Sequence, residues 1–169
     1  RDYSELPPGA IDWAAFAVEP DFIKGKRVGL LMEAGCGLPL DPQIAEAVRR
    51  AAKRIEDAGA HVEPMQPFMT PKMLQGMDHF WRMRSLSDLR TMSAEQRAKM
   101  LPYILTWAES AAGFSGEHIY EAYSQFIATR AAAVAATVGF DFVLSPVSPN
   151  MPAPAEHASP TNDPLRSLE

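Results

Sequence analysis

The chain has 169 residues and a formal net charge of -5, with 47% hydrophobic and 22% charged residues, the balance of an ordinary globular domain. The acidic charge argues against a nucleic-acid partner, and no apolar run approaches the roughly 20 residues needed to cross a bilayer. The single cysteine, Cys36, excludes an internal disulfide, so a reducing cytoplasm is the simplest compartment.

The start of the chain is polar and has two adjacent prolines. We expect residues 1–25 to form a linker that docks through an aromatic pair, Trp13 and Phe16. It lacks the continuous apolar stretch of a signal peptide. Because the chain does not begin with Met and ends at Leu168-Glu169, we expect it to be a piece of a longer protein.

A strand, a helix and a second strand open the predicted α/β core, residues 26–149. The contiguous apolar residues of Lys26–Met32 indicate a buried parallel strand. Asp41 is predicted to cap a helix that has Pro42 at its first position. A second strand over Ala60–Met65 completes a βαβ unit, which predicts a parallel pair.

Residues 70–139 are predicted to be a helical insertion in this core. The expected helix starts are at Thr70, Ser93, Pro102 and Ser115. Ser93 with Gln96 forms a capping box, and Gly139 is expected to end the last helix. The sequence therefore predicts a helix-rich chain around a small sheet.

Phe140–Pro149 is the stretch that most favours a ligand site. Its apolar residues predict a buried strand that ends at Pro146, which cannot donate a ladder hydrogen bond. Ser145 and Ser148 then lie at the carboxyl end of a strand, where ligands bind in open α/β sheets. No activating base is nearby in sequence, so the two serines are interpreted as pocket-lining residues or simply as residues that terminate the strand.

Residues 150–169 are rich in Pro, Ala, Ser and Asn, and we expect an irregular tail. Three predicted strands are few for a doubly wound sheet, which usually has about five or six. We therefore expect one incomplete domain of a larger protein. Its unpaired sheet edge is expected to promote self-association.

The loop around Cys36 offers two weaker readings. Gly35-Cys36-Gly37 lies where a dinucleotide fingerprint would begin, but Leu40 replaces the third glycine and Asp41 puts a negative charge where a pyrophosphate would bind. A flexible strand-to-helix turn is the favoured interpretation. Cys36 would be a nucleophile if a helix N-terminus lowered its pKa, and otherwise is a small residue in a tight loop.

The remaining candidates lie on helices or are scattered. His61, His79, His118 and His157 lack metal-ligand spacing, so we expect no metal site. Trp81–Arg84 is interpreted first as core packing with a solvated cationic edge. The alternative is the wall of an apolar pocket, since Met and aromatic side chains line such sites readily.

Taken in order, these segments resemble the carboxyl-side portion of an amidase signature enzyme. The resemblance rests on residues 1–7, 26–63, 81–89 and 140–169, and covers nearly the whole chain. It implies a partial amidase-signature sheet and hydrolysis of carboxamides to carboxylate and ammonia or amine, without a metal or organic cofactor. Family members use a Ser–cis-Ser–Lys triad whose two serines lie in a Gly/Ser-rich region. That region has no counterpart here, so the resemblance assigns no catalytic residue.

The resemblance does imply substrate-side residues. The segment similar to Val143–Pro149 borders the family's substrate channel, and helices like those around Trp81 and Trp107 shape its acyl pocket. Ser145, Ser148 and Trp81 are therefore the predicted substrate-binding residues. The alternatives are a non-catalytic α/β binding or scaffold module and, on weaker grounds, a nucleotide-binding domain.

Overall fold

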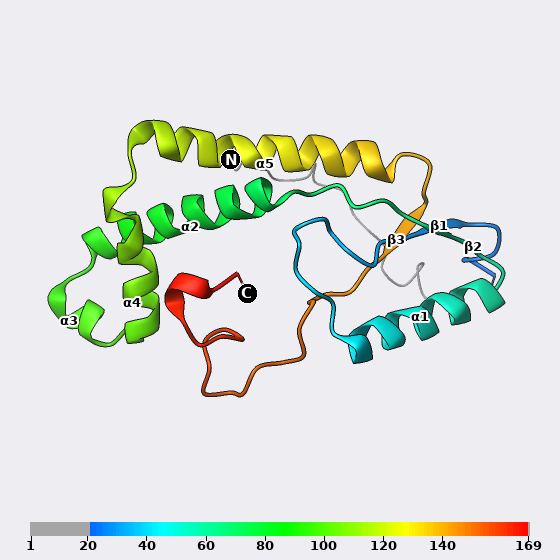
Figure 1. Cartoon of the computed structure of the whole chain (residues 1–169), viewed down its shortest axis with the longest axis horizontal. Coiled ribbons are helices and arrows are strands. Elements are labelled where there is room, and N and C mark those ends of the chain that lie inside the picture. The colour runs from blue at the N-terminus through cyan, green and yellow to red at the C-terminus, as the bar shows by residue number, and fades with distance from the viewer. Residues whose placement is uncertain (1–20, 169) are drawn as a thin grey trace, which may run out of the picture.

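The computed structural model describes residues 21–168 of the chain. The strands are β1 (Arg27–Leu30), β2 (His61–Pro64) and β3 (Phe142–Leu144). The helices are α1 (Pro42–Asp57), α2 (Pro71–Thr91), α3 (Ala94–Ala98), α4 (Pro102–Glu109) and α5 (Gly116–Thr137), with 3₁₀ turns η1 (Ser110–Gly113) and η2 (Pro164–Arg166). The sheet and α1 lie at one end, α3 and α4 lie at the other, and α5 runs along the molecule between them (Figure 1).

The sheet is parallel throughout and has the order β2-β1-β3. Arg27 pairs with His61 on one side, and Val28 pairs with Phe142 on the other. The predicted parallel βαβ pair is confirmed. Val28 in the central strand is only 2% exposed, so the apolar run that predicted this strand does face a core.

The prediction that the third strand is buried is wrong within the described residues. β3 lies at an edge of the sheet, and Phe142 and Val143 are 41% and 40% exposed. An apolar run signals that a strand needs cover on its faces, but it does not say whether the same chain provides that cover. The outer edge of β3 has no strand partner among residues 21–168.

The helix starts confirm the capping predictions. The Asp41 carboxylate accepts a hydrogen bond from Gln43 N at 2.7 Å, and Pro42 occupies the first helical position. Ser93 and Gln96 form both hydrogen bonds of a capping box. Each cap satisfies a backbone N–H that the helix leaves unpaired, which is why short polar side chains at these positions are informative.

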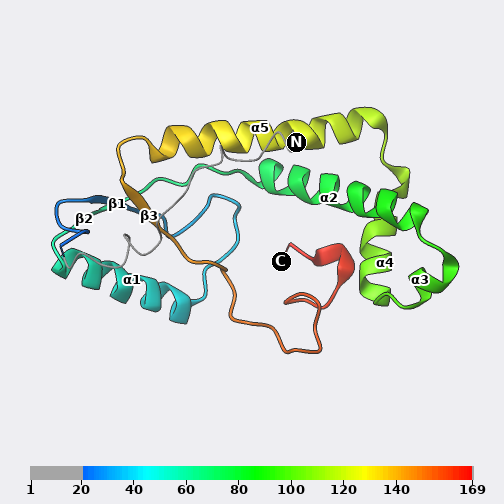
Figure 2. The same cartoon turned by 180° about the vertical axis from the view of Figure 1, so that it is seen from behind.

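Helices α2 and α5 pack closely side by side, as both ribbon views show (Figures 1 and 2). A Cβ at Gly76 would lie 2.4 Å from the side chain of Gln125, so glycine allows this approach. Phe80 of α2 contacts Phe126 edge to face, with ring centroids 5.2 Å apart. Buried residues of α2 and the α4–η1 segment, which pack together, are Leu86, Leu89, Ala108 and Ala111. The buried residues in or next to the sheet and α1 are Val28, Leu31, Ala45, Ala52, Ala60 and Met65.

The tail after β3 is mostly irregular, as expected, but it ends in the 3₁₀ turn η2. It begins after Pro149, whose carbonyl accepts a hydrogen bond from Asp41 N at 2.8 Å. It then crosses to the helical end of the molecule, where η2 lies beside α4 (Figure 1). The tail therefore spans both ends of the fold, which a Pro-rich composition alone did not predict.

Of the predicted N-terminal linker, only residues 21–25 are described, and they form turns; Trp13 and Phe16 lie outside the described residues. Between residues 21 and 168, no helix combines the length and apolarity required to cross a bilayer.

Candidate functional site

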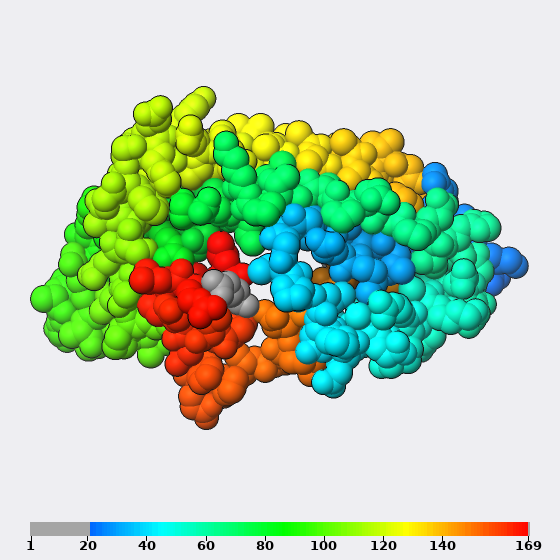
Figure 3. Space-filling view, viewed as in Figure 1, coloured from blue at the N-terminus to red at the C-terminus, as the bar shows by residue number. Residues whose placement is uncertain are grey.

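A cavity lies at the carboxyl ends of β1 and β3, where the sequence predicted a ligand site. Its volume is about 200 Å³, and its walls are the loop after β1, residues 31–40, and the segment 145–149. The loop after β1 and the tail face each other across a hollow on the same side of the molecule (Figure 3). Ligand pockets are usually about 300–1,000 Å³, so this cavity holds a small group or one part of a larger molecule.

Backbone contacts hold both walls of the cavity in place. Leu31 N donates to Leu144 O at 2.9 Å, which extends the β1–β3 pairing to the rim. Met69 N donates to Ala34 O at 2.8 Å and fastens the loop to the segment before α2. Gly35 has φ +102°, and a Cβ there would lie 2.2 Å from Met69 O, so this contact requires glycine.

Ser145 and Ser148 line the same cavity, and both are exposed. The Ser148 hydroxyl accepts a hydrogen bond from Asn150 N at 3.2 Å, which turns the chain into the tail. That contact supports the strand-terminating reading, and the position in the cavity supports the lining reading. The structure thus brings these two predicted residues together, and their contact with substrate stays a prediction.

Cys36 lies in the wall of this cavity, although sequence reasoning treated its loop separately. Its Sγ is 4.0 Å from Met69 Sδ. Burial, with a smaller contribution from Glu33, raises the pKa of the thiol, so the protonated form dominates near neutral pH. The described lining residues include no His, Lys or Arg that would generate a thiolate, which disfavours Cys36 as a nucleophile.

The glycine pair around Cys36 has a packing role that replaces the nucleotide-binding reading. Gly35 allows the contact with Met69, and Gly37 adopts φ +77° in an open turn. The first turn of α1 is already capped by the Asp41 carboxylate. A phosphate at that helix end would meet this negative charge, so the geometry disfavours a dinucleotide there.

Trp81 does not line the cavity described above; it lies on α2 and is 43% exposed. Its indole contacts Phe126 edge to face at 6.4 Å between centroids. The Arg84 guanidinium lies 4.8 Å from the indole centroid, a cation–π geometry. The structure therefore does not bring Trp81 together with Ser145 and Ser148.

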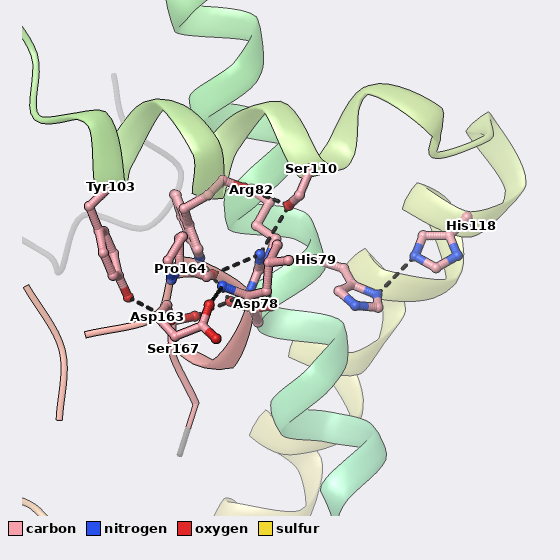
Figure 4. A network of polar contacts seen from close by, with 11 residues as sticks. Asp78, His79, Arg82, Tyr103, Ser110, His118, Asp163, Pro164 and Ser167 are labelled. Atoms are coloured by element: carbon pink, nitrogen blue, oxygen red, sulfur yellow. Dashed lines mark hydrogen bonds and ion pairs between the residues drawn. The ribbon is translucent and has the colours of Figure 1, made fainter. Parts of the chain in front are cut away.

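Arg82 corrects the expected solvated cationic edge, because its side chain is buried. Its Nε donates to Asp78 at 2.6 Å, and its terminal nitrogens donate to Ser110 Oγ, Pro164 O and Ser167 Oγ (Figure 4). Trp107 Nε1 donates to the other oxygen of Asp78 at 3.3 Å. One buried ion pair thus joins α2, η1 and the tail.

Two of the four histidines are neighbours in space. His79 of α2 and His118 of α5 approach with Nδ1 and Nε2 2.9 Å apart (Figure 4). His61 and His157 are exposed. In the part of the chain that the structure describes, no group of three or more His, Cys, Asp or Glu side chains is arranged to hold a metal ion.

Sequence reasoning missed three features: the Cys36 wall of the cavity, the buried Asp78–Arg82 pair and the histidine pair. Opposite charges four residues apart on the predicted helix were a usable signal for the ion pair. The other two join segments more than 30 residues apart, and no local pattern indicates such contacts.

Comparison with known proteins settles the family. A family model described as Amidase matches residues 9–168. The chain belongs to the amidase signature family. No curated protein matches it. The match to the Amidase family model confirms the resemblance that the sequence segments indicated.

One solved structure places the fold within this family. A bacterial aryl acylamidase of the amidase signature family matches with a TM-score of 0.62 at 22% sequence identity. The match covers 78% of this chain and 29% of that chain, so the present chain spans less than a third of that relative. At this identity the likeness shows the fold: a helix-rich α/β arrangement around a parallel sheet.

Proposed function

We propose that the chain is a portion of an amidase that hydrolyses carboxamides to carboxylate and ammonia or amine. In this reaction water adds to the carbonyl carbon, the C–N bond breaks, and the leaving nitrogen takes a proton. The observation that carries the proposal is the cavity at the carboxyl ends of β1 and β3, in a chain that matches the Amidase model over residues 9–168. This chain would supply scaffold and one wall of the substrate channel.

Within that wall, we assign Ser145 and Ser148 to hydrogen bonding with the amide rather than to attack on it. Both hydroxyls are exposed at the cavity, and its described lining contains no basic side chain to activate them. Trp81 would contact substrate at a separate place, through its exposed indole. The nucleophile and base of the family triad would come from sequence beyond these 169 residues.

The direct test is an activity assay of the purified 169-residue chain with acetanilide and a short aliphatic amide. We expect no turnover, because the described site lacks an activated nucleophile. Turnover that persists in Cys36→Ser would refute the proposed inactivity, because that variant removes the only thiol in the chain.

A binding measurement tests the assigned wall separately. Acetanilide titrated into the labelled chain is expected to shift the amide resonances of residues 31–38 and 145–149, with weak affinity because the cavity is small. Ser145→Ala should weaken these shifts, and Ser87→Ala, an exposed serine on α2, should not. Shifts confined to other regions would reject the assigned wall and favour a scaffold module. If acetanilide quenches the tryptophan fluorescence of the unmodified chain but not that of Trp81→Phe, the result would support the proposed contact between substrate and Trp81.

We also propose that the chain self-associates through the outer edge of β3. That edge carries exposed Phe142 and Val143, and Phe22 packs beside it with its ring centroid 5.7 Å from that of Phe142. An uncovered strand with apolar side chains is a template for pairing with another strand. Light scattering at increasing protein concentration measures this association.

A further inference from the structure

Two imidazoles join α2 to the first turn of α5. His118 Nε2 and His79 Nδ1 are 2.9 Å apart, and both side chains are half-buried (Figure 4). A hydrogen bond between two imidazole nitrogens needs one donor and one unprotonated acceptor. If both rings are protonated, both nitrogens carry hydrogen and the two positive charges face each other.

The ring of Phe114 packs against both histidines. The Phe114 ring lies 4.9 Å from His79 and 4.3 Å from His118, measured between centroids. His118 N donates to Ser115 Oγ at 3.1 Å, so the cap of α5 fixes the backbone of His118. Movement of the first turn of α5 away from α2 would separate the rings.

Three cations and two carboxylates line the cavities beside the pair. On α2, Asp78 is already bound to Arg82 and Trp107, while Arg82 and Lys72 are cationic. The other charged groups lining the adjoining cavities are Glu121 of α5 and Arg166 of the tail. Burial, the neighbouring His118 and Arg82 lower the pKa of His79, whereas Asp78 acts in the opposite direction.

We propose that the His79–His118 pair is a pH-sensitive contact that holds the start of α5 on α2 while one ring is neutral. Protonation of both rings releases this corner. His79 also lines a cavity of about 340 Å³ together with Arg82 and Leu165, which places the pair close to η2. The inference concerns folding of this chain and does not depend on the proposed amidase function.

The sign of the pH dependence follows from the lowered pKa of His79. The unfolded chain takes up a proton near the ordinary histidine pKa of about 6.5, before the folded chain does. Stability is therefore highest above that value, falls as the pH drops through it, and stops falling below the folded pKa. One unit between the two values corresponds to a tenfold change in the folding equilibrium, or on the order of 3 °C in Tm for a chain of this size.

The experiment compares thermal unfolding of the full chain at pH 7.5 and 5.5. We expect a larger fall in Tm for the unmodified chain than for His118→Gln, whose neutral side chain cannot acquire the second charge. His157→Gln, at an exposed position in the tail, should behave like the unmodified chain. An equal fall in Tm for His118→Gln and the unmodified chain would overturn the proposal.

A second measurement on the unmodified chain keeps the test independent of variant folding. Hydrogen exchange should show residues 114–121 losing protection at pH 5.5 before the centre of α5 does. In ¹⁵N spectra of the imidazoles, His79 should take up its proton below the ordinary histidine pKa. Titration of His79 at its ordinary pKa of about 6.5, or unchanged protection of this segment, would count against the contact.

Discussion

Two arginine–carboxylate pairs in this molecule have the same chemistry and very different surroundings. Arg82 and Asp78 lie within α2 with side chains 7% and 7% exposed, whereas Arg27 and Glu63 join β1 to β2 with side chains 49% and 47% exposed. The buried pair also holds the tail through Pro164 and Ser167. The exposed pair holds two strands that backbone hydrogen bonds already join.

The difference shows how burial decides what an ion pair contributes. At the sheet, water and salt screen the charges, and loss of one partner leaves the other hydrated. In the buried Asp78–Arg82 pair, removal of one partner leaves the charge of the other uncompensated and away from water. The buried pair should therefore dominate stability, and the following variants test that ordering.

The largest effect is expected for Arg82→Ala. It leaves the Asp78 carboxylate buried and frees three acceptors in η1 and the tail, which should destabilise the fold by about 3–5 kcal/mol. Urea unfolding measures the loss, and limited proteolysis should cut within residues 150–168 more readily. Arg84→Ala on the same helix is the matched control, since Arg84 is exposed and its guanidinium lies over the Trp81 indole.

A milder loss in Asp78→Leu/Arg82→Met than in Arg82→Ala would show that the unpaired carboxylate causes most of the damage. If Arg82→Ala and Arg84→Ala unfold at the same urea concentration, burial of an arginine does not determine how much it contributes to stability.

Gly35→Ala should come next. The φ of +102° and the backbone oxygen of Met69 at 2.2 Å from the added Cβ together predict a loss of at least about 1 kcal/mol. The damage should be local, so acetanilide binding to the loop after β1 should weaken as well. Gly37→Ala has the same sign of φ but open space around it and provides the control. Identical stability of the two variants would mean that the Met69 contact is unimportant.

Val143→Lys should alter association rather than folding. A charge on the edge strand opposes pairing with another chain, so the average mass at high concentration should fall toward that of one chain. Val134→Lys is the control, because it places the same charge on the exposed face of α5 and not on the strand edge. Assembly through β3 would be contradicted if the unmodified chain stays monomeric at every concentration, or if both variants change the average mass equally.

The smallest effect is expected for Glu63→Gln. The Arg27 guanidinium lowers the pKa of Glu63, so this pair stabilises the fold above the ordinary carboxyl value of 4.5 and loses that contribution as the pH falls through the folded pKa. The Tm difference from the unmodified chain should therefore be small at pH 7, shrink with added salt, and vanish under acidic conditions. A difference that persists in 1 M salt would show that contacts other than charge are involved.

The sequence predicted those parts of the fold that depend on neighbours along the chain. Asp41-Pro42, Thr70-Pro71 and the Ser93–Gln96 box marked helix starts because each cap satisfies local N–H groups. The strand ends near Pro64 and Pro146 followed from the missing donor of proline. The position of the cavity followed from the rule that parallel strands place their carboxyl ends at one edge.

Features that depend on distant partners were not predictable in the same way. The apolar residues of β3 looked buried, but their cover depends on what lies beside the edge. Arg82 looked like a surface charge because its acceptors are 28 to 85 residues away, apart from Asp78. The histidine pair was hidden for the same reason, since His79 and His118 meet only after α2 and α5 have packed.

The parallel order β2-β1-β3 also has a consequence for how the chain folds. Arg27 meets Glu63 after a separation of 36 residues, but it meets Asp141 only after 114. Closing the longer loop costs about 1 kcal/mol more in chain entropy, and non-local pairing of this kind slows folding. During synthesis, the first βαβ unit emerges from the ribosome well before β3. One edge of β1 therefore stays unpaired until β3 has been synthesised.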